Sequence, residues 1–191
     1  MEHVEVEQKY ALPDPAALVH RLTELDAVPL GENQQVDTYF NAPHRDFLAA
    51  DIVSEWLRLR TETGQDTPAT ASINFKRWLP LGAPEATHCD EFESVLSDVD
   101  AVRKLLHALG FTEMVTVNKT RVQWRLGDVI VAMDTVAGLG SFVELEYAGE
   151  AASVTEATDA LEESVSKIDV ELGARHRQGY PHLLLDRQRP R

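Results

Sequence analysis

The stretch VEVEQKY at residues 4–10 sets the pattern on which the predicted fold depends. Its β-branched residues favour a strand, and in a strand alternate side chains share one face. Glu5, Glu7 and Lys9 therefore point the same way at intervals of about 6.6 Å, while the valines take the opposite face. A single strand of this kind is typical of an ordinary half-buried sheet with its charges in water. The pattern becomes informative because later segments repeat it.

The same alternation of apolar and ionic residues returns along most of the chain. In residues 55–60, for example, Arg58 and Arg60 alternate with leucines. The predicted ionic face collects residues from about seven strands: Glu5, Glu7, Lys9, Arg58, Arg60, Lys76, Glu91, Glu93, Lys119, Arg121, Asp134, Glu144 and Glu146. Burying so many unpaired charges would cost too much free energy, so they must face water, one another or a charged ligand.

Helical patterns between these strands complete the predicted fold. We expect helices over residues 16–27, 98–109 and 153–172, and a short helical cap within the tail at 175–184. Helices that cover the apolar faces of a curled sheet would leave the ionic faces inside. The sequence therefore predicts an α+β protein, in which a closed antiparallel barrel surrounds a polar tunnel and the helices pack on its outside.

Composition limits the class of protein. With 191 residues, 43% of them hydrophobic, we expect one domain spanning residues 1–191. The chain has no apolar run of 18 residues and no leader pattern, so we expect a cytoplasmic protein that does not enter a membrane. The lone Cys89 excludes an intramolecular disulfide. A formal net charge of -14 argues against binding to extended nucleic acid and favours a small anionic ligand held inside.

Both signs of charge on the predicted lining have a chemical use. Carboxylates are hard oxygen ligands for Mg²⁺ or Mn²⁺, whereas arginine and lysine bind phosphate oxygens. A site for phosphate alone would need only the cations, and a calcium store would need only the carboxylates. The mixture therefore favours a polyphosphate bound together with its metal ions.

Motifs along residues 5–147 resemble the CYTH, or triphosphate tunnel metalloenzyme, superfamily. The matching segments are Glu5-x-Glu7-x-Lys9, Asp37-Thr38-Tyr39-Phe40, Leu57-Arg58-Leu59-Arg60, Phe75-Lys76, Glu91-Phe92-Glu93, Lys119-x-Arg121, Asp134 and the run Gly138 to Glu146. Two segments depart from the family pattern: Asn41-Ala42-Pro43 replaces Asp-Thr-Pro, and Gly179-Tyr180 replaces Ser-Tyr. The resemblance implies a barrel of about eight strands, and it is strongest toward class IV adenylyl cyclase-like proteins. Because relatives often pair, it also implies a homodimer.

The resemblance further implies roles for individual residues. The expected metal ligands are Glu5, Glu7, Asp134, Glu144 and Glu146. The expected catalytic cations, which bind the phosphates and the charge that develops during transfer, are Lys9, Arg58, Arg60, Lys76 and Arg121. Lys119 is expected to bind substrate as well, unless a bulge turns it outward. Glu91 and Glu93 either bind metal or orient the cations, Arg175, Arg177 and Tyr180 are candidates to close one tunnel mouth, and Asp37 and Tyr39 are expected to anchor their strand.

Three classes of function follow from this lining. An enzyme would convert ATP to cyclic AMP and pyrophosphate, or would hydrolyse tripolyphosphate, thiamine triphosphate or a nucleoside triphosphate. Because no residue stands out as a general base, a module that binds nucleotide or polyphosphate without turnover is the second class. A lipocalin-like carrier is the third, but it would need an apolar interior.

Overall fold

A computed structural model of the chain describes residues 3–50, 52–64, 67–83, 88–150 and 153–188, without the side chains of residues 3–5 and 88. The strands, in chain order, are β1 (His3–Glu5), β2 (Glu7–Ala11), β3 (Val28–Asn41), β4 (Glu55–Gly64), β5 (Thr70–Leu79), β6 (His88–Val95), β7 (Thr112–Leu126), β8 (Val129–Val136), β9 (Gly140–Tyr147) and β10 (Arg175–His176). The helices are α1 (Pro15–Glu24), α2 (Val99–Ala108), α3 (Val154–Ile168) and α4 (Tyr180–Gln188).

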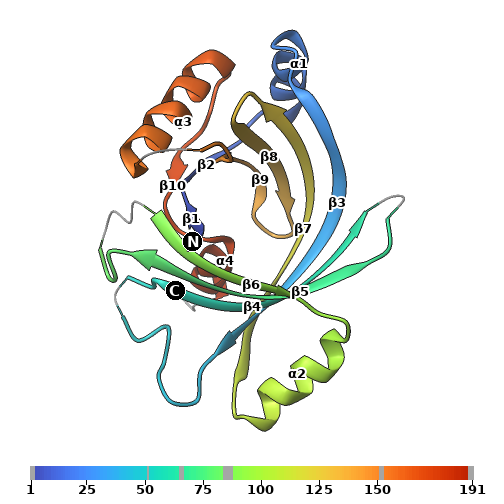
Figure 1. Cartoon of the computed structure of the whole chain (residues 1–191), viewed down its shortest axis with the longest axis vertical. Helices are drawn as coiled ribbons and strands as arrows, with labels where there is room; N and C mark the ends of the chain where they lie inside the picture. The colour runs from blue at the N-terminus through green and yellow to red at the C-terminus, as the bar shows by residue number, and fades with distance from the viewer. Residues whose placement is uncertain (1–2, 51, 65–66, 84–87, 151–152, 189–191) are drawn as a thin grey trace.

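The ten strands form one antiparallel sheet in the order β1-β6-β5-β4-β3-β7-β8-β9-β2-β10. Figure 1 shows the sheet curling around a central space, with β3 and β7 as its long curved strands. The antiparallel sheet and its curvature agree with the prediction. The number of strands differs from the expected eight because β1 and β10, of three and two residues, pair at the two ends of the order.

One residue joins β1, at one end of the strand order, to β2, the next-to-last strand at the other end. β1 pairs with β6 and β2 pairs with β9, yet only Val6 separates β1 from β2 in the chain. The buried Val6 side chain belongs to an apolar cluster beneath α1 and α3. The N-terminal segment therefore contacts both halves of the curled sheet.

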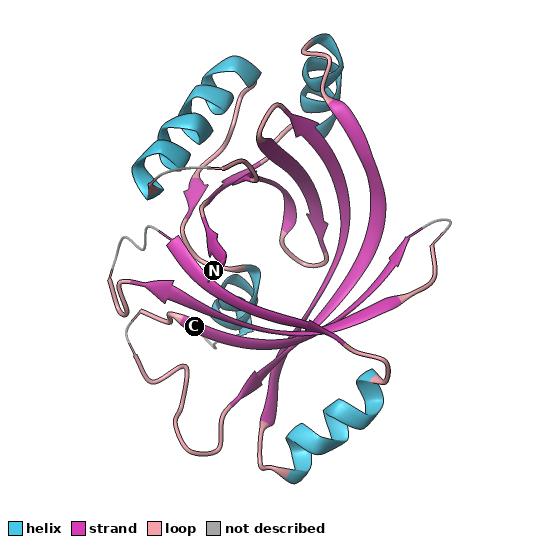
Figure 2. Ribbon diagram, viewed as in Figure 1, coloured by secondary structure: helices cyan, strands magenta, loops and turns pink. Residues whose placement is uncertain are grey.

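Three helices cover the outer face of the sheet, as predicted. Leu18 and Leu22 of α1 and Leu161 of α3 pack with residues of β2, β8 and β9 in one buried cluster. Leu106 of α2 packs with Phe40 of β3 and with Leu57 and Leu59 of β4 in a second cluster. Figure 2 shows α1 and α3 beside one half of the sheet and α2 beside the other. These helices bury the apolar faces of the strands and leave the ionic faces toward the centre.

Helix α4 contradicts the prediction that all helices pack outside. Its Tyr180 shares a buried cluster with Tyr39, Trp56, Val117 and Phe142, whose strands also carry the ionic residues on that face. The tail does form the short helix that was predicted. However, it packs inside the curve of the sheet, because the inner face carries apolar residues at one end of the strands and charged residues farther along.

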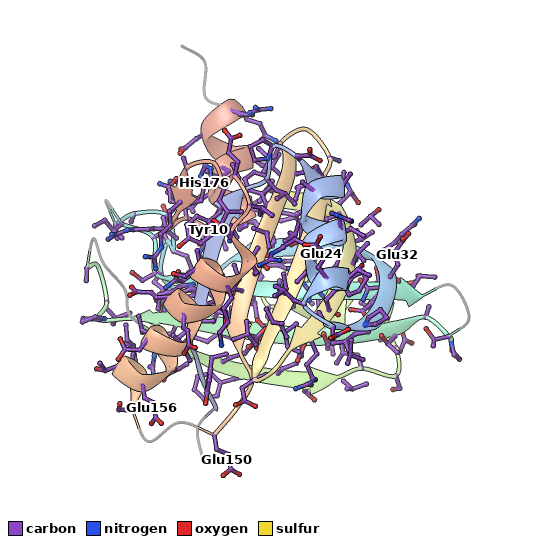
Figure 3. All side chains as sticks on the ribbon, turned by 90° about the horizontal axis from the view of Figure 1, so that it is seen from above. Tyr10, Glu24, Glu32, Glu150, Glu156 and His176 are labelled. Atoms are coloured by element: carbon purple, nitrogen blue, oxygen red, sulfur yellow. The ribbon has the colours of Figure 1, made fainter. Side chains whose placement is uncertain are left out.

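The outer surface is acidic. Glu24, Glu32, Glu150 and Glu156 are exposed, and Figure 3 shows Glu150 and Glu156 at one edge of the molecule and Glu24 beside α1 on the side toward the viewer. The net charge of -14 is therefore carried partly by residues remote from the inner face. None of the helices in the described ranges is both long enough and apolar enough to cross a bilayer.

Candidate functional site

A cavity of about 560 Å³ lies against the inner face of the sheet. Its charged lining residues are Glu7, Lys9, Asp37, Arg58, Arg60, Lys76, Glu91, Glu93, Lys119, Arg121, Glu144 and Glu146. Aromatic and small residues complete the lining: Tyr39, Trp56, Asn74, Trp78, Gly179, Tyr180 and Pro181. Among the described residues, the lining therefore carries six cations and six carboxylates. One third of the chain's 18 lysines and arginines thus gather in a single cavity.

The structure brings all six predicted phosphate-binding cations to this cavity. Lys119 was the uncertain one, because a bulge in its strand would turn it outward. The β3–β7 ladder has register shifts between Pro29 and Gly31 and between Tyr39 and Phe40, and Lys119 pairs with Gln35 in the regular section between them. The alternation therefore stays in phase at Lys119, and its side chain faces inward.

Asp37 organises two of the cations, in an arrangement that we call the Asp37 centre (Asp37, Arg58 and Arg60). Arg60 donates from Nε to Asp37 Oδ1 at 2.6 Å and from Nη2 to Oδ2 at 2.7 Å, and Arg58 Nη1 lies 3.5 Å from Oδ2. Burial alone would raise the pKa of Asp37, which is 1% exposed, but the bonds from Arg60 and the charge of Arg58 hold the pKa well below its usual range. Asp37 therefore orients cations, whereas the sequence suggested only an anchor for its strand.

Asp134 organises two further cations, together with a tyrosine from α4, in the Asp134 centre (Asp134, Lys119, Arg121 and Tyr180). Arg121 Nε donates to Oδ1 at 2.7 Å, and Oδ2 accepts from Arg121 Nη2 at 2.5 Å, Tyr180 Oη at 2.9 Å and Lys119 Nζ at 3.0 Å. Asp134 is 1% exposed and lies behind the residues that line the cavity. Its role as a metal ligand stays a prediction, and its two oxygens already accept four hydrogen bonds.

Burial and the neighbouring charge of Arg121 lower the pKa of Lys119 to about 8, although Glu144 and Asp134 act in the opposite direction. Two ammonium groups lie over the Tyr180 ring, with Lys9 Nζ 4.4 Å and Lys119 Nζ 5.1 Å from its centroid. Its hydroxyl donates to Asp134, and burial with the charges of Glu144 and Asp134 raises the pKa of that hydroxyl far above its usual range. Tyr180 therefore lines the cavity as a neutral residue.

Two predicted metal ligands face each other at one side of the cavity. Glu7 of β2 pairs directly opposite Glu146 of β9, and both line the cavity. Like charges directly opposite each other on neighbouring strands are destabilising unless a cation lies between them or close by. The backbone of Glu5 belongs to β1, but its side chain lies outside what the structure describes. Glu7 and Glu146 are therefore the described carboxylates best placed for a cation.

Glu144, the next predicted metal ligand, contacts two cations. Its Oε1 lies 3.0 Å from Lys9 Nζ, and its Oε2 accepts from Arg121. Burial alone would raise the pKa of Glu144, but the charges of Lys9 and Arg121 outweigh it and hold the pKa well below its usual range. Glu144 is thus ionised at any physiological pH. It contacts two cations, and it lines the cavity on the same strand as Glu146.

Glu91 lies among the cations of β4 and β5. Its Oε2 is 3.6 Å from Lys76 Nζ, and its Oε1 is 3.9 Å from Arg58 Nη2 and accepts from Asn74. Glu93 accepts from the Ser72 hydroxyl at 2.8 Å. Of the two roles expected for Glu91, these contacts favour orienting the cations over binding a metal ion.

Arg175 and Arg177, the other candidates for a tunnel mouth, do not line this cavity.

The residues present fit a divalent ion that arrives with a phosphate ligand. In the parts of the chain that the structure describes, no group of three or more His, Cys, Asp or Glu side chains is arranged to hold a metal ion by itself. Mg²⁺ is usually bound by one or two carboxylates together with substrate phosphates and water. The facing pair Glu7 and Glu146 supplies such a partial set, close to cations that suit the phosphates.

Trp78 is a lining residue that the sequence analysis did not name. The structure continues β5 to Leu79, so that Asn74, Lys76 and Trp78 share the inner face. The alternation of side chains that predicted Lys76 to face inward would have predicted the same for Trp78, two residues later. Tyr180 was expected only as a candidate to close a tunnel mouth. No local pattern indicated its hydrogen bond to Asp134, because that bond joins residues 46 positions apart.

Comparisons with known proteins identify the family. The CYTH domain matches residues 3–173. The adenylate cyclase CyaB of Aeromonas hydrophila is 32% identical over 142 residues, which are 74% of this chain and 67% of that protein. A protein of Methanocaldococcus jannaschii is 31% identical over 148 residues, 75% of this chain and 76% of that protein.

Solved structures share the fold over nearly the whole chain. The PH1819 protein of Pyrococcus horikoshii OT3 superposes with a TM-score of 0.82 at 29% identity, covering 96% of this chain and 99% of that chain. A Hippeastrum protein described with a dominant triphosphatase activity superposes with a TM-score of 0.63 at 15% identity, covering 96% and 95%. The span of the domain match and the identity to the two relatives lead to one conclusion: this chain belongs to the CYTH-domain family.

Proposed function

We propose that this protein is a divalent-metal-dependent enzyme that converts ATP to cyclic AMP and pyrophosphate, as a class IV adenylyl cyclase-like member of its family. The observation that carries the proposal is the union, in one cavity, of six phosphate-binding cations with the facing carboxylates Glu7 and Glu146. The name of the Aeromonas relative supports the choice of reaction. We further propose that residues 1–191 form one domain whose sheet closes through Val6 into a barrel.

The cations have donors available for phosphate oxygens. Arg58 Nε is buried and has no hydrogen-bond partner among the described residues, although both Nη atoms of Arg58 lie near carboxylates. A buried donor without a partner costs about 1–3 kcal/mol, and a phosphate oxygen would remove that cost. The Asp37 centre and the Asp134 centre would hold the arginines in fixed orientations, so little reorganisation would be needed as charge develops on the phosphates.

The carboxylate side of the cavity would hold Mg²⁺ or Mn²⁺. Glu7 and Glu146 would be the first ligands, with Glu144 adjacent and Glu5 and Asp134 as further predicted ligands. The ion would neutralise charge on the triphosphate and support in-line displacement at phosphorus. In the cyclase reaction the ribose 3′-hydroxyl attacks the α-phosphorus, the bond from that phosphorus to the pyrophosphate oxygen breaks, and the hydroxyl proton leaves to solvent.

Hydrolysis of a triphosphate is the second candidate function. The lining of the first cavity fits this reaction as well. Its described residues supply groups for phosphates and metal, and they do not select a ribose hydroxyl over water as the nucleophile. The triphosphatase activity named for the Hippeastrum protein belongs to the same fold. Water attack on the γ-phosphorus of ATP, thiamine triphosphate or tripolyphosphate would use the same cations.

The test is incubation of the purified protein with Mg²⁺ or Mn²⁺ and each of these three substrates, followed by chromatography of the products. Cyclic AMP with an equal amount of pyrophosphate supports the cyclase. Phosphate without cyclic AMP supports hydrolysis, and tight binding without turnover indicates a binding module.

Two variants locate the metal requirement. Glu146→Gln should lower the rate by at least about a hundredfold at a fixed Mg²⁺ concentration, because it removes one of two facing carboxylates. Glu150→Gln, an exposed residue close by in sequence, is the matched control and should keep the wild-type rate. A Glu146→Gln protein with the wild-type rate and the wild-type response to Mg²⁺ would refute the metal assignment. A cytoplasmic location and a homodimer stay predictions.

A further inference from the structure

A second cavity of about 660 Å³ adjoins the first. The two share the lining residues Glu7, Lys9, Trp56, Trp78 and Gly179. The rest of the second lining includes the segment 52–54 before β4, the segment 175–178 around β10, and His182 of α4. A molecule bound to the cations of the first cavity therefore has continuous space beside it, which the proposed phosphate and metal contacts do not use.

Two tryptophans lie where the cavities meet. In β4 the inward-facing series is Trp56, Arg58, Arg60, and in β5 it is Asn74, Lys76, Trp78. Each tryptophan is thus one inward-facing position, about 6.6 Å, beyond a phosphate-binding cation on its own strand. Trp56 pairs opposite Lys76, so Trp78 is its diagonal neighbour, within reach of a large aromatic side chain.

The two indoles differ in their freedom to accept a ligand. Trp56 is 6% exposed and packs edge-on against Tyr39, with ring centroids 5.6 Å apart and planes at 82°. His182 lies edge-on at 6.5 Å from the Trp56 ring. Trp78 is only half-buried and lines both cavities. Trp56 is therefore a fixed wall, and Trp78 presents the accessible aromatic surface.

The second lining also includes a buried polar residue, Gln8, whose Oε1 accepts a hydrogen bond from the Tyr10 hydroxyl at 2.7 Å. Gln8 is 3% exposed, and its Nε2 has no hydrogen-bond partner among the residues that the structure describes. A concave site with aromatic walls and a few polar groups is typical of small organic ligands. The cations Arg175 and Arg177 of the same lining would suit phosphate, so the distinguishing feature is the indole surface, on which a base stacks and an inorganic phosphate chain does not.

We propose that the second cavity binds the base of a nucleoside triphosphate by stacking on Trp78, while the phosphates of the same molecule lie in the first cavity. This inference rests on the proposed function and makes it more specific: the substrate is a nucleotide, and inorganic tripolyphosphate occupies only the first cavity. Trp78 is then a specificity-determining residue that does not contact the reacting atoms.

The test is calorimetric measurement of the Kd for ATP and for tripolyphosphate, each with Mg²⁺, on wild type, Trp78→Ala and Trp78→Phe. Trp78→Ala should weaken ATP binding about ten- to a hundredfold and leave tripolyphosphate binding within about twofold, because only ATP has a base to stack. Trp78→Phe keeps an aromatic face and should restore most of the ATP affinity. The control is Phe92→Ala on neighbouring β6, because Phe92 is 46% exposed and belongs to neither lining.

The outcomes separate this inference from the proposed function. Equal weakening of both ligands by Trp78→Ala would mean that Trp78 supports the phosphate site, and it would overturn the inference alone. Unchanged ATP binding would also overturn it, as would a selective loss of affinity for longer polyphosphates, which would assign the second cavity to phosphates. Wild-type protein that binds neither ATP nor tripolyphosphate would overturn the proposed function, and the inference with it. A melting curve for each variant verifies that it is folded.

Discussion

The Asp37 centre and the Asp134 centre are both built around one buried aspartate, but different elements of the fold supply their residues. In each, one aspartate that is 1% exposed holds two cations at the edge of the first cavity. The Asp37 centre comes from the adjacent strands β3 and β4, whose register places Asp37 directly opposite Arg60. The Asp134 centre pairs Asp134 with Arg121 across β7 and β8, but it also includes Tyr180 from α4. One centre thus depends on a single ladder, and the other also depends on the packing of the tail.

The cations of the two centres differ as well. Both cations of the Asp37 centre are arginines, which stay charged at every physiological pH. The Asp134 centre contains Lys119, whose pKa is lowered to about 8 by burial and by Arg121. The comparison teaches that similar ion pairs on one lining can respond differently to mutation, to pH and to the state of the tail.

The largest expected effect is that of Asp134→Asn. This change removes the charge that balances Lys119 and Arg121 and weakens the acceptor for Tyr180, leaving buried cations without full compensation. Removing one partner of a buried ion pair typically costs about 3–5 kcal/mol of the free energy of unfolding. Urea denaturation followed by circular dichroism measures the loss. Asp159→Asn on the exposed face of α3 is the control and should stay within about 0.5 kcal/mol of wild type. A loss below about 1 kcal/mol for Asp134→Asn would show that this centre does not stabilise the fold.

A smaller effect is expected for Asp37→Asn, about 2 kcal/mol, because the side chains of Arg58 and Arg60 are 12% and 14% exposed and can be solvated in part, whereas that of Lys119 is 3% exposed. The Asp37 pKa lies below its unfolded value, so its contribution is fully present above about pH 4 and is lost as the pH falls toward the folded pKa. Wild-type stability should therefore fall on acidification more steeply than that of Asp37→Asn, and the two curves should converge. Parallel curves from pH 6 to pH 2.5 would contradict this account.

The smallest effect is expected for Tyr180→Phe, about 1 kcal/mol, because the ring stays above the ammonium groups and only the hydrogen bond to Asp134 is lost. Double-mutant cycles make the comparison sharp. Tyr180→Phe should couple with Asp134→Asn by at least about 0.5 kcal/mol, and it should be additive with Asp37→Asn, which it does not contact. Equal coupling to both aspartates would show that the tail stabilises the whole lining and has no special link to the Asp134 centre.

The alternation of side chains predicted much of the site. Because a strand places every second residue on one face, the sequence alone grouped Lys9, Arg58, Arg60, Lys76 and Arg121, and the structure brings them to one cavity. The same rule applied to one more residue would have included Trp78. The pairing of Glu7 with Glu146 also follows from two strands of matching pattern, although their register had to come from the structure.

Long-range packing explains what the sequence could not provide. The apolar residues of α4 would suit either face of the sheet, so nothing local indicated that Tyr180 lies inside. Asp37 resembles any polar residue near the end of a strand until its ladder with β4 places it opposite Arg60. Asp134 matched the family pattern for a metal ligand, but sequence does not reveal how many donors already surround a carboxylate.

The single-residue link at Val6 has a consequence for the order in which the protein is assembled during synthesis. Strand β2 lies near the start of the chain, yet its partner β9 ends at Tyr147, so ribosomes need on the order of ten seconds to make the segment between them. The β3–β4 hairpin that carries the Asp37 centre is complete much earlier. We therefore expect a nascent chain to pair Arg60 with Asp37 well before Glu7 meets Glu146. The facing pair Glu7 and Glu146, the proposed site of the divalent ion, is therefore expected to be the last part of the cavity lining to form.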